Sequence, residues 1–537
     1  MTAPEPAPAP ALAPALGRAT LVQAAGTALS RITGFGRVFA FAYALGATPL
    51  ADTYTLANET PNIIFELALG GVLSGMVLPE FVRQIRKDDD EGWRAVSAVV
   101  TVSLVACAAL AVAFVAVAPL FIRLYTLRKE GDVGRDQLAV ATTLLRLFAP
   151  QVFLYGTVYL STALLRAQRQ FAAPMFAPVL NNLVVIALFL SWPSVVGSRS
   201  LDAVRDDNGA LLLLGLGTTA GVAAMALAQL PIGTLRRKVR LVWAPRHPSV
   251  VRIVRLGVWT AGFVATNQLA LFVVRFLAND RAGDVTVYFL AYTIFLLPHG
   301  VVAVSIISAL QPELADRWAG GDRDSFVRHV STGIRSIAAI IVPAAIGYVL
   351  LARPLVGMLL EHGALAEGAR AADIASTLAC FAIGLPAFSA WLFLGAVYQA
   401  MQNTRSLFFV YLVENTINVV AAIVLYPSLG VQGLALAYSF AYLAGSAVAI
   451  AHLRRAIGGI DGRAIASSMA RVAAAAAVMA ASVAAIVVFV GGNEGPGAVV
   501  RVVVAAVTGV TVYLVASRFF GVGEIGALLS PRRRRGQ

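Results

Sequence analysis

Two arginines, Arg31 and Arg37, lie near the middle of the first long apolar segment of the chain. If that segment spans a membrane, each charge costs roughly 2.5–3.5 kcal/mol on insertion scales and needs a partner or a function. A planar guanidinium contacts phosphate or pyrophosphate through two parallel hydrogen bonds, which suits arginine to anions. Both residues are therefore candidates for a cationic cavity wall that binds an anionic substrate. Structural pairing of the two arginines is the alternative, with the partners Asp52, Glu59 or Glu66.

The segment between the two arginines contains Gly34 and Gly36. Glycine weakens a helix, so this point favours a break of the kind found in discontinuous transporter helices. On an unbroken helix, six residues place Arg31 and Arg37 about 120° apart, whereas a break would bring them together. A third intramembrane arginine, Arg275, lies within two turns of a helix end and is expected to extend to the lipid headgroups.

The second apolar segment carries a polar stripe. Asn58, Asn62 and Glu66 recur every four residues and share one helix face, which must contact protein or water rather than lipid. We count them among the candidate substrate-binding residues. Small residues follow at Gly70, Gly71 and Ser74. We group these with the two glycines of the first segment as gating or cavity residues, although close helix packing also explains them.

A third polar group, Glu414, Asn415 and Asn418, lies in an apolar segment near the C-terminus. Glu414 and Asn418 are four residues apart on one face, with Asn415 beside them. Such a group is a candidate cation or proton site, and a buried, hydrogen-bonded structural cluster is equally compatible. The five histidines show no metal-ligand spacing, and no nucleophile elbow or phosphate loop is present, so we expect no catalytic site, no metal site and no enzyme activity.

The composition requires a membrane around these residues. Of the 537 residues, 59% are hydrophobic and 13% are charged, whereas soluble proteins have about 25% charged residues. The apolar runs are long and continuous, so they predict helices rather than the alternating strands of a barrel. The fold class is therefore an all-α polytopic membrane protein. The net charge of +14 indicates loops that face anionic lipid, and nucleic-acid binding is not expected.

Hydropathy windows predict about fourteen spanning helices. Their approximate ranges are 19–46, 57–82, 95–122, 137–164, 172–192, 210–232, 251–277, 284–311, 332–352, 372–401, 406–427, 432–453, 464–490 and 498–520. The arginine run 532–535 should be cytoplasmic by the positive-inside rule, and an even number of helices then places both termini in the cytoplasm.

The chain also repeats itself at a shift of about 233 residues. Tyr54 aligns with Tyr288, Pro79-Glu80 with Pro312-Glu313, and Asn181 nearly with Asn415. Two parallel six-helix lobes that rock about a central site follow from this pattern, with two extra C-terminal helices. The expected division is a disordered Ala/Pro-rich tail at 1–18, an N-lobe at 19–240, a C-lobe at 241–460, the extra helices at 461–522 and a basic tail at 523–537.

The first two helices carry a resemblance to a known family. The stretches Leu29 to Arg37, Leu45 to Asn58 and Pro61 to Ser74 are similar to the start of the MurJ (MviN) family of lipid II flippases. The fourteen helices and two lobes resemble the multidrug/oligosaccharidyl-lipid/polysaccharide exporter architecture of that family. The resemblance covers most of the chain, and the high Ala, Arg and Gly content is typical of a high-GC bacterium such as an actinobacterium.

The resemblance assigns roles to individual residues. It implies that Arg31 and Arg37 are cavity arginines that contact a pyrophosphate. It matches Asp52 to an acidic residue that follows the first helix, and Asn62 to the asparagine of a Pro-Asn pair, and we count both as candidate substrate-binding residues. The sequence also departs from the family pattern. Acidic or basic residues of many members are replaced at several positions: Val38, Phe65, Glu66, Gly70 and a position near Thr293. We therefore expect a less basic cavity than in much of the family.

The resemblance implies export of lipid II across the bacterial plasma membrane by alternating access, for cell-wall synthesis. It further implies a groove for the lipid tail at the extra helices. We expect no cofactor, and the group at Glu414 allows coupling to a cation or to the membrane potential. Expected partners are lipid II, membrane lipids and proteins of cell-wall synthesis or division. The alternatives are an exporter of another polyprenyl-linked oligosaccharide, and a structural or regulatory membrane protein that does not transport.

Overall fold

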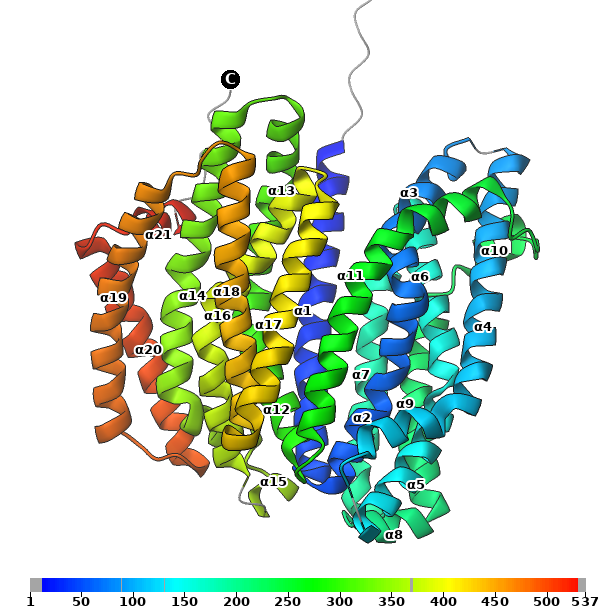
Figure 1. Cartoon of the computed structure of the whole chain (residues 1–537), viewed down its shortest axis with the longest axis horizontal. Helices are drawn as coiled ribbons and strands as arrows, with labels where there is room; N and C mark the ends of the chain where they lie inside the picture. Colours follow the sequence, from blue (N-terminus) through cyan, green and yellow to red (C-terminus); the bar gives the residue numbers. More distant parts are fainter. Residues whose placement is uncertain (1–11, 88, 130, 368–369, 530–537) are drawn as a thin grey trace, which may run out of the picture.

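The computed structural model describes residues 12–87, 89–129, 131–367 and 370–529. These residues form helices and connecting turns, with no strand among them. The long helices lie side by side with their axes roughly aligned, and the chain runs up and down between the two ends of the bundle (Figure 1). The all-α fold class is therefore confirmed. Both ends of the described chain lie on the same side of this bundle, which we call the terminal side. The other side is called the far side.

The first half of the chain forms one group of helices. They are α1 Leu12–Leu45, α2 Pro49–Phe65, the π-helical turn η1 Glu66–Gly70, α3 Gly71–Ile85, α4 Asp90–Thr126, α5 Gly131–Phe148, α6 Pro150–Ala167, α7 Ala172–Val195, α8 Leu201–Asp206, α9 Asn208–Ala228 and α10 Ile232–Lys238.

The second half forms another group. It contains α11 Pro248–Ala278, α12 Asp284–Pro298, the π-helical turn η2 His299–Ala303, α13 Val304–Ala319, α14 Arg323–Leu360, α15 Ala364–Glu367, α16 Ala371–Ala400, α17 Thr404–Leu429 and α18 Val431–Ala456. Three helices follow: α19 Gly462–Phe489, α20 Gly495–Phe519 and α21 Gly523–Leu529.

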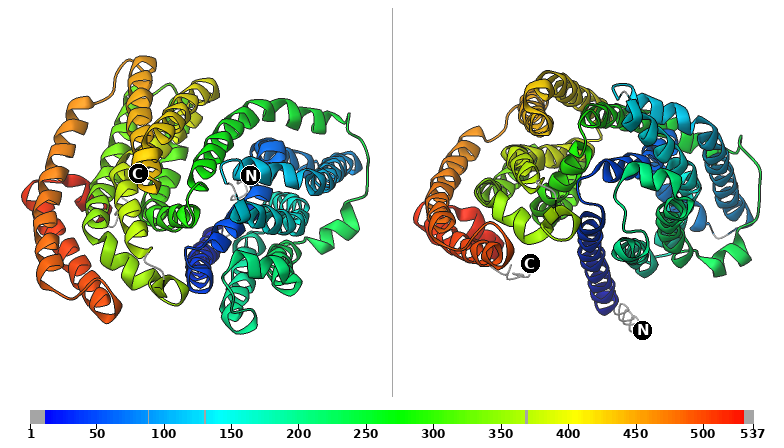
Figure 2. Two further views of the ribbon diagram at one scale, coloured as in Figure 1. Left: turned by 60° about the horizontal axis from the view of Figure 1, so that its bottom comes forward. Right: turned by 90° about the horizontal axis from the view of Figure 1, so that it is seen from below.

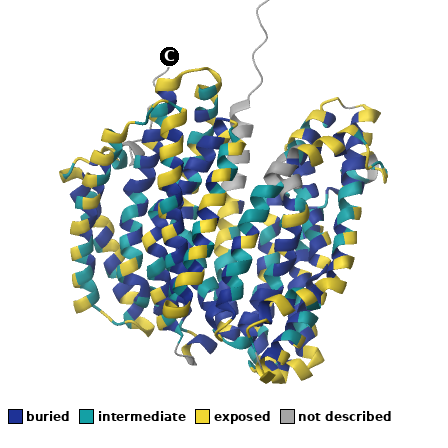
Figure 3. Cartoon of the chain, viewed as in Figure 1, coloured by how far each residue is buried: buried dark blue, intermediate teal, exposed yellow. Residues whose placement is uncertain are grey.

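Twelve helices in the described part of the chain are long and apolar enough to cross a membrane. Two more long helices, α1 and the continuous α2–η1–α3, run beside them (Figure 1). Together they give the fourteen helices that hydropathy predicts. Buried residues face the interior of each helix group, and exposed residues, many of them apolar, cover its outside (Figure 3). An apolar exterior of this kind is what contact with lipid requires.

The two groups share an irregularity at the same place in the repeat. The π-helical turn η1 begins at Glu66 and η2 begins at His299, which is the predicted offset of 233 residues. A π-turn adds one residue to a helical turn and is often found at functional sites. Both copies of the repeat thus interrupt their second helix at the same depth.

Two helices stand at the junction of the groups. α1 packs along α7 of the first group, and Figure 2 shows it between the two groups when the molecule is seen from below. α11 packs on α3 of the first group and on α17 of the second. It therefore connects the two groups mechanically as well as along the chain.

The expected break in α1 does not occur, and that prediction was wrong. α1 is one continuous helix through Gly34 and Gly36. A Cβ at Gly34 would contact the Asn182 amide, and one at Gly36 would press on Ile186, both on α7. The glycines therefore allow close packing of α1 on α7, which is the usual use of small residues in membrane helices.

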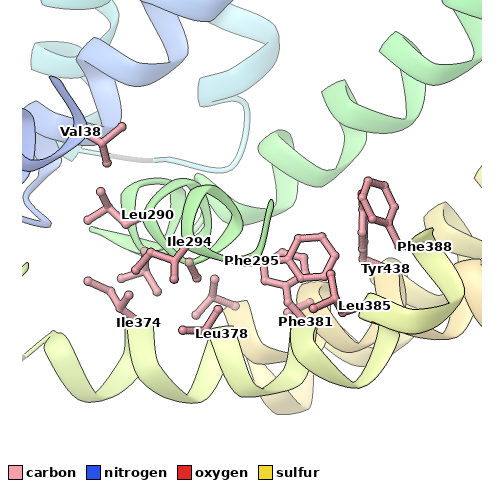
Figure 4. Close-up of a cluster of buried hydrophobic side chains, with 14 of the residues drawn as sticks. Val38, Leu290, Ile294, Phe295, Ile374, Leu378, Phe381, Leu385, Phe388 and Tyr438 are labelled. Carbon is pink, nitrogen blue, oxygen red and sulfur yellow. The ribbon is translucent and has the colours of Figure 1, made fainter. Parts of the chain in front are cut away.

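The second group has a rigid aromatic core. Phe295 of α12, Phe381 and Phe388 of α16 and Tyr438 of α18 pack against one another in tilted and edge-to-face pairs, with ring centroids 5.3 to 5.9 Å apart (Figure 4). Aromatic pairs at this spacing add about 0.5–1.5 kcal/mol each beyond their buried area. The group is therefore expected to move as a unit.

The extra helices α19 and α20 pack on α14 at the outer edge of the second group (Figures 1 and 2). Between these three helices lies an apolar cavity of about 480 Å³. Its lining includes Pro343, Tyr348, Met479 and Gly509. A space with this apolar lining suits a hydrocarbon chain.

Candidate functional site

A polar cavity of about 290 Å³ lies between the two helix groups. Its walls come from α1, α2, α6, α7, α9, α11 and α12, so neither group forms it alone. The candidate residues Arg37, Asn58 and Asn62 all line it. The polar stripe of α2 thus faces this cavity at two of its three positions, because a four-residue spacing keeps the side chains on one face.

Three buried polar atoms in the cavity wall have no hydrogen-bond partner in the described part of the chain. They are Oδ1 of Asn181, Oε1 of Gln268 and Nη1 of Arg275. An unpartnered buried polar atom costs about 1–3 kcal/mol, so native proteins keep few of them. These three atoms have almost no exposed surface, so in this conformation they lie behind the cavity surface, and the polar groups of the lining include those of Arg37, Asn58 and Asn62.

Arg275 of α11 forms a salt bridge with Glu59 of α2 inside the cavity wall. Our expectation that Arg275 extends to the headgroups was therefore wrong, because its guanidinium turns inward to an intramembrane carboxylate. A second cavity of about 270 Å³ continues on the other side of this pair toward Tyr292 and Thr293 of α12. The Glu59–Arg275 pair thus borders both spaces and connects α2 to α11.

Arg31 and Arg37 point to different places. Since α1 is unbroken, Arg37 reaches the cavity while Arg31 extends to the second group and lies against Gly300 of the π-turn η2. A Cβ at position 300 would overlap the Arg31 guanidinium, so glycine makes room for it. Within the described ranges neither arginine has an acidic partner, and the alternative of pairing with Asp52, Glu59 or Glu66 is not what the structure shows.

Asp52 lies outside the cavity and is completely buried on the far side. Its carboxylate accepts hydrogen bonds from the Thr286 amide at 2.9 Å, from the Thr286 hydroxyl at 2.8 Å and from the Gly283 amide. The helix α12 begins after Gly283, which has a φ of 86° and no capping side chain. Asp52 of α2 therefore caps a helix of the other group, where the helix dipole favours an anion.

Glu66 and the small residues of the second span serve packing in this conformation. The Glu66 carboxylate accepts a hydrogen bond from Tyr159 at 2.9 Å, and it fills the space that a Cβ at Gly70 would need. Glu66 is absent from the lining of the cavity around Arg37. Gly71 and Ser74 belong to α3, but their side-chain surroundings are outside the described residues.

Glu414, Asn415 and Asn418 are buried together in α17. Asn415 donates to the Glu414 carboxylate at 2.9 Å, whereas Oδ1 of Asn418 and Nε1 of the nearby Trp391 lack partners within the described residues. No basic side chain in that part of the chain pairs with Glu414. An intramembrane carboxylate without a counter-charge is a candidate functional group.

The sequence alone did not identify Asn181, Gln268 and Arg275 as cavity residues. Asn181 was noted only because it aligns with Asn415 in the repeat, and Gln268 was not singled out. An available signal was that each is polar within an apolar helix, where such residues avoid lipid. For Arg275, the acid Glu59 at similar membrane depth was a further signal, although nothing in the spacing joins residues so far apart.

Comparisons with known proteins agree with one another. The family model described as lipid II flippase MurJ matches residues 41–505. A probable lipid II flippase MurJ of Rhizobium tropici is 26% identical over 413 residues, which is 77% of this chain and 76% of that protein. A lipid II flippase MurJ of Burkholderia cenocepacia is 26% identical over 407 residues, 72% of this chain and 74% of that protein.

Solved structures show the same fold. A lipid II flippase MurJ in an inward closed conformation superposes with a TM-score of 0.76 at 19% identity, covering 94% of this chain and 100% of that one. An inward-facing multidrug resistance transporter of the MATE family gives a TM-score of 0.67 at 16% identity, covering 79% and 94%. The two-lobed transporter architecture is therefore shared with both.

Proposed function

Because this chain belongs to the lipid II flippase MurJ family, we propose that it moves lipid II from the cytoplasmic to the outer leaflet of a bacterial plasma membrane. The match to the family model carries this proposal, since it spans residues 41–505 and includes most of the cavity. The cavity supports it, because it lies between the lobes and its lining includes Arg37, Asn58 and Asn62. Lipid II in the outer leaflet is then the precursor for cell-wall synthesis on the outer face of the membrane.

The cavity chemistry suits the head of this substrate. The pyrophosphate would contact Arg37, since guanidinium groups bind phosphate oxygens strongly and Arg37 lines the cavity. The amides of Asn58, Asn181 and Gln268 would meet hydroxyl and amide groups of the sugar and peptide. The polyprenyl tail would stay in lipid, with the apolar cavity between α14, α19 and α20 as its groove.

Transport would proceed by alternating access. Ligand pockets usually measure about 300–1,000 Å³, so the cavity of about 290 Å³ encloses only part of so large a head. The lobes must therefore separate to admit it and separate again on the far side to release it. We assign the terminal side to the cytoplasm from the excess of basic residues there, and with it both termini.

Depletion of the protein in its own host tests the function. Lipid II should accumulate in the inner leaflet, as measured by a probe that reaches only the outer face, and expression of the wild-type chain should restore its exposure. If lipid II exposure stays normal while another polyprenyl-linked sugar accumulates, the substrate is that sugar. If depletion changes the distribution of no lipid-linked sugar between the two leaflets, the transport function is contradicted.

We also propose that Glu414 binds the driving cation or proton. Its burial at 1% exposure without a basic partner, beside the unpartnered Asn418 oxygen, supports this role. Glu414→Gln keeps the size and most hydrogen bonds of the side chain but removes the charge. We therefore expect flipping to lose its dependence on an imposed Na⁺ or pH gradient and to fall about 10-fold, with little loss of stability.

The measurement is lipid II flipping in proteoliposomes with and without each gradient. Glu313→Gln is the matched control, because Glu313 is a half-exposed acid that faces His329 near the end of α13. Its gradient dependence should equal that of the wild type. Gradient dependence that survives in Glu414→Gln would show that the carboxylate is a structural group.

A further inference from the structure

A second polar pocket, of about 300 Å³, lies on the terminal side and is separate from the central cavity. It is formed where α3 ends, α4 begins and α11 begins. Its charged and polar lining includes Arg83, Gln84, Lys87, Glu91, Ser249 and Arg252. Three cations thus face one carboxylate. His247 also lines the pocket, where its Nδ1 accepts a hydrogen bond from the Ser249 amide at 3.2 Å.

The pocket wall is held in place by a buried chain of hydrogen bonds. Gln84 donates to the Ser249 hydroxyl at 3.1 Å and to the Glu80 carboxylate at 2.8 Å, and Glu80 also holds Arg83 at 2.6 Å. Glu80, Gln84 and Ser249 are 6%, 7% and 2% exposed. This chain joins α3 to α11 and fixes Arg83 at the rim. Lys87 has no acidic partner among the described residues.

An extended segment of the linker between α10 and α11 runs along α4. The backbone amides of Arg240 and Val242 donate to the hydroxyls of Ser97 and Thr101 at 3.1 Å each. Backbone donors near lipid need such partners, because no water replaces them. The alternate residues Leu241 and Trp243 point outward and are 92% and 63% exposed.

These outward side chains locate the membrane surface. Tryptophan concentrates where hydrocarbon meets the headgroups, and an isolated, almost fully exposed leucine is most stable in lipid. Basic residues flank the segment at Arg240 and Arg246. The linker therefore lies at headgroup level, on the same side of the molecule as the cationic pocket at the beginning of α11.

We propose that this pocket binds the phosphate of an anionic phospholipid from the leaflet on the terminal side. Basic pockets between membrane helices on the cytoplasmic side are suited to anionic headgroups. The ligand chemistry, a phosphate ester, is shared with soluble phosphates. The exposed Leu241 and Trp243 favour the lipid, since only a lipid has acyl chains for them to contact.

A bound headgroup would act on the cavity through α11. That helix starts at the pocket and carries Arg275, the partner of Glu59, near its other end. The lipid would hold the start of α11 against α3 and so stabilise the conformation described above. This consequence rests on the proposed function, whereas the binding site itself does not.

The test measures lipid binding to the full chain purified from membranes. Wild type, Lys87→Gln/Arg252→Gln and the control Arg86→Gln/Arg94→Gln are each titrated with phosphatidylglycerol in phosphatidylcholine nanodiscs, and bound lipid is counted by native mass spectrometry. The control removes two exposed arginines of the same region that do not line the pocket. The pocket variant loses two direct charge-assisted contacts to the phosphate and should bind at least ~100-fold more weakly, whereas the control, whose arginines do not reach the pocket, should stay close to the wild-type affinity.

Two further arms keep the outcome decisive. Glu91→Gln removes the one carboxylate of the lining and should bind phosphatidylglycerol more tightly than wild type, an effect that a damaged fold cannot imitate. Inorganic phosphate is the soluble competitor, and displacement of the lipid at low millimolar phosphate would identify a soluble ligand instead. Equal affinity in wild type and the pocket variant would overturn the proposal, because binding would then not involve these cations.

Discussion

Arg37→Ala is expected to lower lipid II flipping at least ~100-fold while leaving the protein folded in the membrane. Arg37 lines the central cavity and has no acidic partner in the described part of the chain, so its charge is available to the substrate. Each hydrogen bond to a charged group contributes about 1.5–3 kcal/mol, and a bidentate phosphate contact contains two of them. Their loss corresponds to ~100-fold or more in binding.

The charge and the fork of the guanidinium are separable. Arg37→Lys keeps the charge but loses the bidentate geometry, so we expect an intermediate rate. Flipping is measured with purified protein in proteoliposomes that contain labelled lipid II. Arg123→Ala, which removes an exposed arginine from the last turn of α4, should retain the wild-type rate. If the Arg37→Ala variant flips lipid II at the wild-type rate, the cavity is excluded as the pyrophosphate site.

The large features of the fold could be predicted because they depend on local pattern. A spanning helix must be about 20 apolar residues long, so hydropathy gives the fourteen helices without knowledge of their packing. The repeat offset also has a local origin, since two copies of one unit keep corresponding residues at one separation. The π-turns at Glu66 and His299 follow the same offset.

The contacts of the site could not be predicted, because they join distant segments. Glu59 and Arg275 pair across α2 and α11, and no spacing rule connects them. The family pattern indicated a missing arginine near Thr293 on α12. The structure brings Arg275 from α11 into a cavity that Thr293 also lines, so a basic group reaches this region from another helix.

The glycines of α1 show a different limit of sequence interpretation. Gly34 and Gly36 favour either a break or a close helix contact, and helix propensity alone does not distinguish them. The neighbour α7 decides the matter, because Asn182 and Ile186 occupy the space beside the glycines. An unbroken helix therefore directs Arg37 to the central cavity and Arg31 to the π-turn η2 of the second group.

The second large effect is expected at Asp52, which joins the lobes on the far side. Its carboxylate caps α12 and satisfies two backbone amides and the hydroxyl of Thr286. Asp52→Ala would leave these donors buried and unpartnered, at about 1–3 kcal/mol each. Only this conformation loses that stabilisation, because separation of the lobes on the far side breaks the contact anyway. The equilibrium should therefore shift toward the far-side-open state by ~100-fold or more.

A cysteine in the cavity wall reports this shift. Leu271→Cys lines both cavities, and the native Cys107 and Cys380 are replaced by alanine so that it is the sole thiol. A membrane-impermeant maleimide applied on the far side should label Asp52→Ala about 10-fold or more faster than the parent, with Asp52→Asn between them.

Flipping should fall in the same Asp52 variants, since a transporter that seldom returns to the terminal-side-open state seldom reloads. Asp280→Ala removes an exposed far-side acid and serves as the matched control, with unchanged labelling. Equal labelling of Asp52→Ala and this control would mean that the Asp52 cap does not hold the lobes together. The contact between the lobes on the far side would then depend on other interactions there, such as the salt bridge between Arg370 and Asp284. Faster labelling combined with slower flipping would instead show that the free energy of one helix cap sets the balance between the two states.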